Sequence, residues 1–319
     1  MDVTPSRILQ LQTSFYGFFK QGYEIADTWW EQLAMRVPSS SKQNDYGWMA
    51  DLPKMREWLG PRTIQGLQAY SYSLTNRKFE LTVGVDREHI EDDSLGIYEY
   101  KFKDMGDSAK KHPDELIADL LINGHSYASY DGQGFFDTAH PVNLRDASVT
   151  NLSGANTQSN YFTGTPLTQA NFQAMRAKML GYCDEGGRPL KVVPNVLWCG
   201  PALEPVARKI LEADTILEAL QQGGNNVAAA GVTNITKGQA KVLMIPELSG
   251  GALDLVWGLA CTSKPIKPFI FQDRKADVFV PKTALTDENV FRENRFDFGI
   301  DNRRNAGFSL WFLALRASG

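Results

Sequence analysis

Three residues of types that can bind a metal ion or perform acid–base chemistry lie close together in the sequence. Asp131, Asp137 and His140 all fall in the segment DGQGFFDTAHP. Two carboxylates and an imidazole suit a divalent metal, so a metal-dependent hydrolase is one candidate function. The alternative is local turn chemistry, because Asp131 precedes a glycine and His140 precedes a proline. We favour turn chemistry, because most loop Asp and His residues bind nearby backbone groups.

The rest of the sequence contains no pattern that indicates catalysis. It has no GxSxG nucleophile motif and no GxxxxGK[ST] phosphate loop, although Gly223 and Gly224 are adjacent. Its three cysteines form no CxxC pair, which argues against a zinc site or disulfide framework and indicates a reducing compartment. Four arginines near the C-terminus alternate with acidic residues, so an ion-pair face is favoured over a DNA-binding stripe. We therefore predict a non-enzymatic protein without a cofactor or bound metal.

The composition is that of an ordinary soluble protein. The 319 residues are 43% hydrophobic and 22% charged, and the formal net charge is −4. A weakly acidic net charge argues against a sequence-independent nucleic-acid binder, which requires a basic face, but it leaves room for a local basic patch. The N-terminus has no signal-peptide pattern, and no stretch approaches the ~20 apolar residues of a membrane span. We expect folding in a cytosol and no membrane association.

The elements that must position any functional surface begin with a predicted β-hairpin at 69–93. Apolar and polar residues alternate in AYSYSLT and again in FELTVGVD, on either side of the short polar turn NRK. An isolated two-stranded hairpin is at best marginally stable in water. Its apolar stripe must therefore lie either on the body of this chain or on a neighbouring subunit.

The remaining pattern predicts a chain of helices followed by an α/β part. We expect a helix at 6–35, a polar linker at 37–44 and irregular, aromatic-rich chain at 45–66. A long helical segment is expected at 94–124, interrupted or kinked at Pro113, and a capped helix at 168–182 follows the loop-rich stretch 126–165. The α/β part has a predicted helix at 202–213 and a predicted mobile loop at 221–238. Its predicted strands are 192–199, 240–245, 253–260 and 268–272, followed by long strands near the C-terminus.

Several stretches make the whole chain resemble the Mu-like major head subunit family, which has the Hong Kong-97-type phage capsid fold. They include YGWMADLPKMREWLGPR, YSLTNRKFELTVGVDREHIEDD, DELIADLLINGH, DGQGFFDTAHPV, KPFIFQDR and RRNAGFSLWFLALRAS. The resemblance implies an α+β fold divided into named regions. These are an N-terminal arm (1–50), an E-loop hairpin region (51–93), a spine helix and P-domain (94–190), an A-domain (191–266) and a return to the P-domain strands (267–319).

The resemblance also implies a function and partners. Subunits of this family form the hexamers and pentamers of an icosahedral head around double-stranded DNA, which the shell contacts only weakly. Scaffold, maturation protease and portal are expected to be separate proteins, and the product is a virion capsid assembled in the host cytoplasm. Some capsids of this fold cross-link an E-loop lysine to a distant asparagine. Lys78 lies at the predicted turn, but the partner Asn and catalytic acid have no match, so no cross-link is expected.

The resemblance suggests which residues contact neighbouring subunits. In the predicted hairpin these are Tyr70, Tyr72, Leu74, Phe79, Leu81 and Val83, and in the N-terminal arm they are Phe15, Phe18 and Trp29. Two alternative functions stay open on the residues alone. One is another phage structural protein, such as a tail tube or decoration protein, and the other is the metal-dependent hydrolase.

Overall fold

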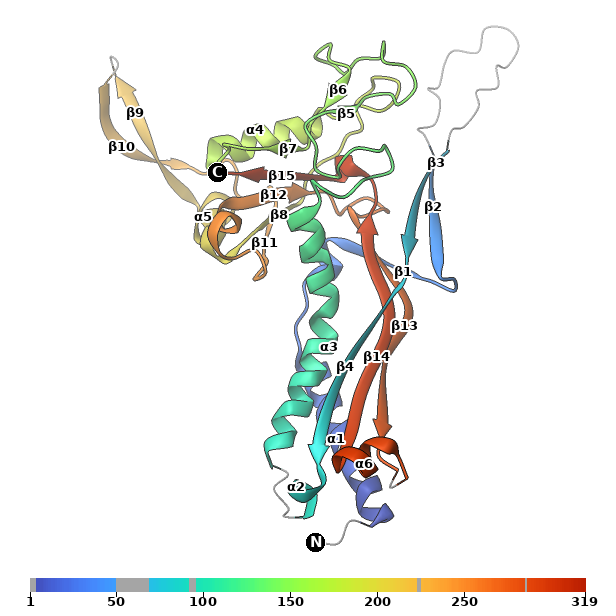
Figure 1. The fold of residues 1–319 in the computed structure, drawn as a ribbon. Helices are drawn as coiled ribbons and strands as arrows, with labels where there is room; N and C mark the ends of the chain where they lie inside the picture. Colours follow the sequence, from blue (N-terminus) through green and yellow to red (C-terminus); the bar gives the residue numbers. More distant parts are fainter. Residues whose placement is uncertain (1–3, 50–68, 92–95, 223–224, 285) are drawn as a thin grey trace.

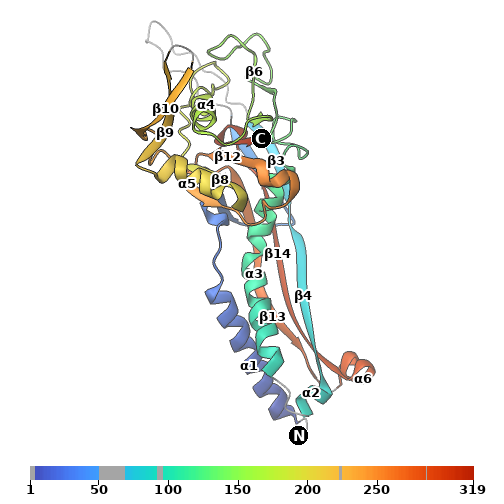
Figure 2. The same ribbon diagram turned by 90° about the vertical axis from the view of Figure 1, so that its left-hand side faces the viewer.

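The computed structural model describes residues 4–49, 69–91, 96–222, 225–284 and 286–319. The subunit has a long, narrow lower part and a broader upper part (Figure 1). The helix α3 (Gly96–Asn123) runs the length of the lower part, and α1 (Pro5–Ile25) lies beside it in both views (Figure 2). Pro113 is accommodated inside α3, which continues as one helix. No described helix is both long and apolar enough to cross a membrane.

A four-stranded sheet packs against these two helices. Its strand order is β1-β13-β14-β4, with β1 parallel to β13 and the other pairs antiparallel. The strands are β1 (Ala34–Pro38), β13 (Phe269–Lys282), β14 (Arg295–Phe308) and β4 (Arg77–Asp86). Two short helices lie at the narrow end, α2 (Arg87–Glu91) after β4 and α6 (Glu288–Glu293) between β13 and β14.

Aromatic side chains and two glycines join α1 to α3 and the sheet. The Phe15 ring stacks on Phe102 with centroids 4.2 Å apart and meets Phe298 edge-on at 5.1 Å. Gly22 and Gly106 lie where the two helix backbones meet, and a Cβ on either would overlap backbone atoms of the other helix. The apolar face of α1 is thus buried within its own subunit.

The upper part is built on a five-stranded sheet of order β11-β8-β12-β15-β7. Trp198 and Trp257 are its largest fully buried side chains. The strands are β11 (Lys241–Met244), β8 (Val196–Cys199), β12 (Val256–Ala260), β15 (Ala314–Ser318) and β7 (Tyr161–Phe162). The helices α4 (Gln169–Leu180) and α5 (Glu204–Glu212) pack around this sheet, and β5 (His140–Pro141) pairs with β6 (Thr157–Gln158). Single 3₁₀ turns are at Trp30–Gln32, Pro201–Leu203, Gly251–Leu255 and Trp311–Leu313.

Two strand pairs project from opposite sides of the upper part (Figure 1). One is β9 (Thr215–Gln222) with β10 (Asn225–Thr233), and the other is β2 (Gln43–Met49) with β3 (Ala69–Thr75). The predicted mobile loop at 221–238 is therefore wrong, because most of it belongs to β9, β10 and the turn that follows.

The predicted pairing of 69–75 with 79–86 is also wrong. β3 pairs with β2, whereas β4 pairs with β14 in the long sheet. The chain does not reverse at Asn76. Its side chain instead donates hydrogen bonds to Ser39 Oγ and the Ser41 carbonyl, both at 2.9 Å, and holds the crossing from one sheet to the other. Alternation in a sequence predicts strands, but it does not say which strands pair.

The N-terminal prediction needs a similar correction. The helix expected at 6–35 ends at Ile25, and the Asp114 carboxylate then holds the short turn at Trp30–Gln32. The expected linker at 37–44 lies partly in β1 and β2, and 45–49 is strand rather than irregular chain. The remainder of the predicted irregular segment, 50–66, lies outside the described residues.

Candidate assembly surfaces and the buried His140 cluster

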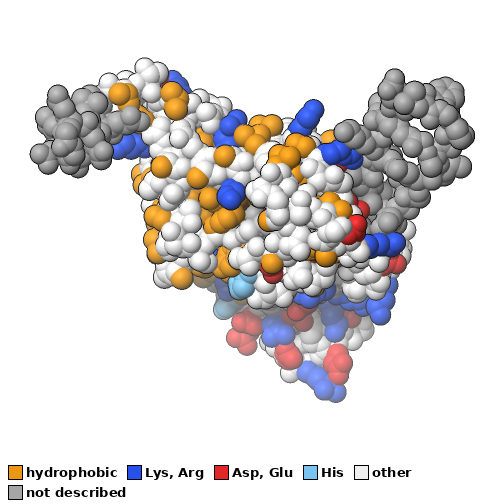
Figure 3. Space-filling view, turned by 90° about the horizontal axis from the view of Figure 1, so that it is seen from above, with side chains coloured by type: hydrophobic (Ala, Val, Ile, Leu, Met, Phe, Trp, Pro, Cys, Tyr) orange, Lys and Arg blue, Asp and Glu red, His pale blue; other side chains and the backbone are white. Residues whose placement is uncertain are grey.

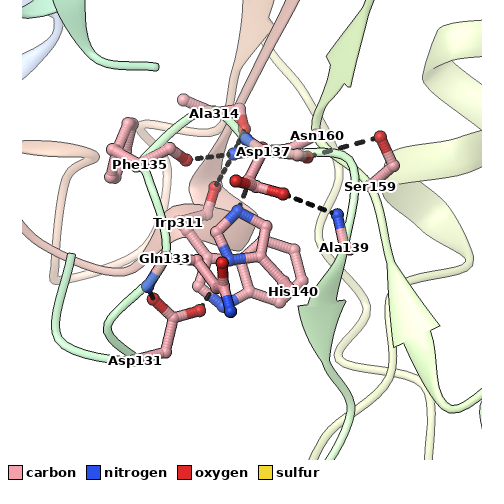
Figure 4. Close-up of polar contacts among 10 residues, drawn as sticks. All are labelled: Asp131, Gln133, Phe135, Asp137, Ala139, His140, Ser159, Asn160, Trp311 and Ala314. Carbon is pink, nitrogen blue, oxygen red and sulfur yellow. Dashed lines mark hydrogen bonds and ion pairs between the residues drawn. The ribbon is translucent and has the colours of Figure 1, made fainter. Parts of the chain in front are cut away.

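His140 and Asp131, two of the three candidate metal ligands, meet in a buried cluster (Figure 4). His140 Nδ1 lies 2.6 Å from Asp131 Oδ2, and the two side chains are 0% and 2% exposed. The other ring nitrogen lies 3.2 Å from Asn160 Oδ1. The imidazole stacks on the Trp311 indole with centroids 4.2 Å apart and planes 4° from parallel. Both nitrogens and one ring face of His140 are therefore occupied by this chain.

Asp137, the third candidate, takes part in local turn chemistry. Its carboxylate accepts a hydrogen bond from the Ala139 backbone N–H at 2.8 Å, and Asp131 Oδ1 accepts one from Gln133 N–H at 3.2 Å. The predicted turn interpretation is confirmed at both aspartates but is wrong for His140, which is buried in the short strand β5 and contacts side chains instead. Across the described ranges, no group of three or more His, Cys, Asp or Glu side chains is placed to hold a metal ion.

Asn160 links this cluster to the C-terminal segment, although no signal in the sequence marks this residue. Its amide nitrogen donates to the carbonyls of Phe135, Trp311 and Ala314 at 2.8–3.1 Å. Its Oδ1 accepts from the Asp137 backbone N–H at 2.9 Å. The network therefore ties the loop around His140 to the end of the chain, and its role is structural.

The predicted E-loop residues in β3 lie on their own subunit. Leu74 is 5% exposed, and both Leu74 and Tyr72 approach Gly307 of β14. The Phe308 backbone N–H donates to Tyr72 Oη at 3.4 Å. The backbone of Tyr70 pairs with Trp48, and its side chain lies outside the described part of the structure.

In β4, one of the three predicted residues is exposed and the other two are partly buried. The Phe79 ring meets the His112 ring at 4.3 Å, and Val83 packs on the core formed by α1, α3 and the sheet. Leu81 is 42% exposed. Leu81 is therefore the member of this set in β4 with the most apolar surface left for a neighbouring subunit.

The predicted N-arm residues are buried to different degrees within the subunit. Phe15 is 1% exposed and Trp29 is 9% exposed, whereas Phe18 is partly buried with the Lys103 ammonium 5.8 Å from its ring centroid. The backbone N–H groups of Trp29 and Trp30 donate to Asp114 Oδ1 at 3.1 and 2.8 Å. Asp114 thus fixes the joint between α1 and the sheet.

Burial of the Asp114 carboxyl makes this joint sensitive to pH. Burial raises its pKa to about 6, and the two backbone N–H donors only partly oppose that shift. Because the folded state holds the proton more tightly, this contribution to stability is complete below pH ~4 and lost as the pH rises through ~6. Asp114→Asn cannot ionise and keeps an acceptor oxygen for both donors.

We expect Asp114→Asn to be more stable than the wild type at pH 7 by about 1–2 kcal/mol, a value discounted for solvent screening. The difference should vanish near pH 4. Chemical unfolding between pH 4 and 8 measures it, with Asp114→Ala as the control that removes the acceptor. A difference that is independent of pH would contradict this assignment.

Side-chain type does not by itself identify an assembly surface. On the upper face, hydrophobic side chains are scattered among uncharged ones, with basic groups more frequent than acidic ones (Figure 3). Several large hydrophobic side chains among the described residues are highly exposed. These are Leu9, Ile25, Ile97, Tyr100, Leu152, Ile235 and Phe291, between 64% and 87% exposed.

Comparison with known proteins decides the family. The family model for "Mu-like prophage major head subunit gpT" matches residues 8–166, 157–248 and 247–319. The chain belongs to the Mu-like prophage major head subunit family. The head subunit is 33% identical to the major capsid protein of Escherichia phage Mu, over all of this chain and 76% of that protein. It is 27% identical to the Mu-like prophage FluMu major head subunit of Haemophilus influenzae, over 75% of that protein.

Solved structures agree with this assignment. A chain of the bacteriophage JBD30 procapsid is 30% identical and has a TM-score of 0.57, covering 99% of the head subunit and 76% of that chain. A capsid chain of a native GTA particle is only 10% identical but has a TM-score of 0.53, over 90% and 88% of the two chains. The head subunit therefore has the α+β Hong Kong-97-type capsid fold. It is a structural protein that assembles into multi-copy shells, and not an enzyme.

Proposed function

We propose that the head subunit forms the hexamers and pentamers of an icosahedral head of a tailed, double-stranded DNA phage or prophage. The family match along almost the whole chain is the observation that carries this proposal. The family regions then correspond to an N-terminal arm (1–50), a spine helix with P-domain (94–190), an A-domain (191–266) and a P-domain return (267–319). The E-loop region at 51–93 extends back to β2, because β3 pairs with that strand.

In this proposal the β2–β3 pair lies over an adjacent subunit. It projects from the side of the upper part, and Tyr46 anchors its base by donating to Gln272 Oε1 at 2.7 Å. Tyr72 and Leu74 hold the strand pair at its origin, and Leu81 contributes a separate exposed contact in β4. The N-terminal arm is fixed to its own subunit by Phe15, Phe18 and Trp29. Neighbouring subunits then contact other surfaces of α1.

The proposed partners are scaffold, maturation protease and portal proteins, and packaged DNA. The relative from bacteriophage JBD30 has been solved both as a procapsid and as a capsid, which supports a maturation step. A formal net charge of −4 suits a container that contacts its DNA only weakly. Assembly in the host cytoplasm and incorporation into the virion complete the proposal.

Leu81→Asp tests this function through assembly. We expect the variant to keep the thermal stability of the wild type, because its side chain is 42% exposed, but to form few closed particles. Leu74→Asp is the contrasting variant, because burying a carboxylate at a site that is 5% exposed should reduce the folded fraction itself. Sedimentation velocity separates particles from free subunits. Normal particle yield from Leu81→Asp would remove Leu81 from the interface, and free subunits alone from the wild type would contradict the proposed function.

A further inference from the structure

A pocket of about 200 Å³ opens between α3, β4 and β14, beside the exposed side chain of Leu81. Its apolar walls include Phe79, Leu81 and Ile300, and its polar lining includes Asn302, Glu80 and Glu115. Leu81, the exposed member of the predicted interface set, is therefore one wall of a cavity rather than part of a flat surface.

One residue of the pocket lining, Asn302, has a side-chain oxygen without a hydrogen-bond partner in the described part of the chain. Asn302 is 6% exposed, and its amide nitrogen donates to Asp277 Oδ1 at 2.8 Å. Its Oδ1 is buried and has no hydrogen-bond partner among the described residues. Such an orphan acceptor is costly in a folded protein, and an N–H or O–H donor that enters the pocket would satisfy it.

The charges around the pocket favour a cation. Glu80 and Glu115 line it, and neither forms an ion pair with another described residue. The buried Arg304 guanidinium is already neutralised by Asp277 at 2.9 Å. His112 accepts a hydrogen bond from Arg304 Nε through Nδ1, and burial and that positive charge lower its pKa to about 4. His112 is therefore uncharged at neutral pH and does not repel a cation.

We propose that this pocket receives a lysine or arginine side chain from a neighbouring copy of the head subunit. The aliphatic stem covers Phe79 and Leu81, as the stems of these residues do on apolar surfaces. The head group supplies a donor to Asn302 Oδ1 and positive charge to Glu115. This inference rests on the proposed self-assembly and adds a specific contact to it.

The side chain that enters the pocket is best assigned to a second copy of the head subunit. The head subunit belongs to a family that assembles with itself, so each pocket lies in a shell of identical surfaces. The subunit also carries suitable donors. Among the described side chains, Lys42, Lys78 and Lys101 are exposed and form no ion pair.

A pair of charge reversals on one helix tests the pocket. Glu115→Lys places a positive charge at the pocket and should repel the incoming cation. Asp104→Lys makes the same change eleven residues earlier, on nearly the same face of α3 but away from the pocket. Particles are assembled with the scaffold and counted by sedimentation, and the thermal unfolding of each free subunit is measured as the folding check.

We expect Glu115→Lys to lower particle yield by about tenfold or more and Asp104→Lys to leave it within about twofold, at equal subunit stability. Carbodiimide treatment of particles mixed from ¹⁵N-labelled and unlabelled subunits then identifies a lysine occupant. A Glu115 or Glu80 peptide joined to a lysine peptide of the other label supports the proposal.

Equal yields from the two variants would overturn the pocket contact while leaving the proposed function intact, since particles would still form. Cross-links from Glu115 only to the scaffold would overturn the choice of a second copy. Failure of the wild type to form any particle would remove both the contact and the proposed function.

Discussion

Asp277→Ala should lower the free energy of unfolding by about 3–5 kcal/mol, because it leaves the buried Arg304 guanidinium without its counter-charge. Both side chains are 6% exposed, and Arg304 Nη2 lies 2.9 Å from Asp277 Oδ1. Burial already lowers the pKa of Arg304, and the Asp277 carboxylate opposes that shift. Removing the carboxylate therefore takes away the main group that stabilises this buried charge.

The loss should be large because the pair joins four elements. Tyr23 Oη of α1 donates to Asp277 Oδ2 at 3.3 Å, and the Asn302 amide of β14 donates to Oδ1 at 2.8 Å. On α3, Arg304 reaches the Ala109 carbonyl at 3.1 Å and His112 Nδ1 at 2.9 Å. Asp277→Ala would leave the Tyr23 hydroxyl and one Asn302 donor without their acceptor.

The same sheet contains a matched control. Lys275 and Asp301 also join β13 to β14, with an N–O distance of 2.6 Å, but their side chains are 41% and 48% exposed. We expect Asp301→Ala to cost less than about 1 kcal/mol, as is typical of surface pairs. Urea unfolding of both variants measures the difference. Equal losses would show that the buried network does not hold the lower part together.

Gly106→Val should also destabilise the folded subunit strongly. A Cβ at this position would overlap the Phe19 carbonyl oxygen and lie 2.7 Å from the Tyr23 backbone nitrogen. Backbone atoms cannot turn aside as a flexible side chain can, so α1 must move away from α3. We expect a loss of at least about 3 kcal/mol, above the usual cost of overpacking.

Gly17→Ala, a glycine substitution in α1, should stabilise the subunit instead. Gly17 lies inside α1, and a Cβ at this position would meet no described atom of another element within 4 Å. The substitution should stabilise the subunit by about 0.5–1 kcal/mol through helix propensity alone. Thermal unfolding of the two variants tests the packing directly. A stable Gly106→Val subunit would contradict the close contact between the helices.

Local patterns in the sequence predict many of the helices and strands correctly, but they do not predict which strands pair. The helix expected at 94–124 is α3 at 96–123, and the capped helix at 168–182 is α4, whose Thr168 side chain accepts from Asn171 N–H. Period-two alternation located β3 and β4 correctly. It could not show that each pairs with a different strand, because pairing depends on distant segments at 43–49 and 295–308.

The same limit applies to the residues of the His140 cluster, whose local contacts are predictable and whose distant contacts are not. The turns at Asp131 and Asp137 were predictable because their partners are two residues away. Asn160 and Trp311 lie 20 and more residues from His140, and no local signal connects them. Likewise, Arg304 belongs to an alternating charged stretch that predicts a solvated or intersubunit ion-pair face, yet it is buried against Asp277.

Electron cryomicroscopy of particles assembled from this chain tests the central claim most directly. We predict closed shells of hexamers and pentamers in which the β2–β3 pair of each subunit lies on an adjacent subunit. In the same map, β4 should remain paired with β14 of its own chain. Shells in which β2–β3 contacts only its own subunit, or preparations that contain no shells, would contradict this arrangement.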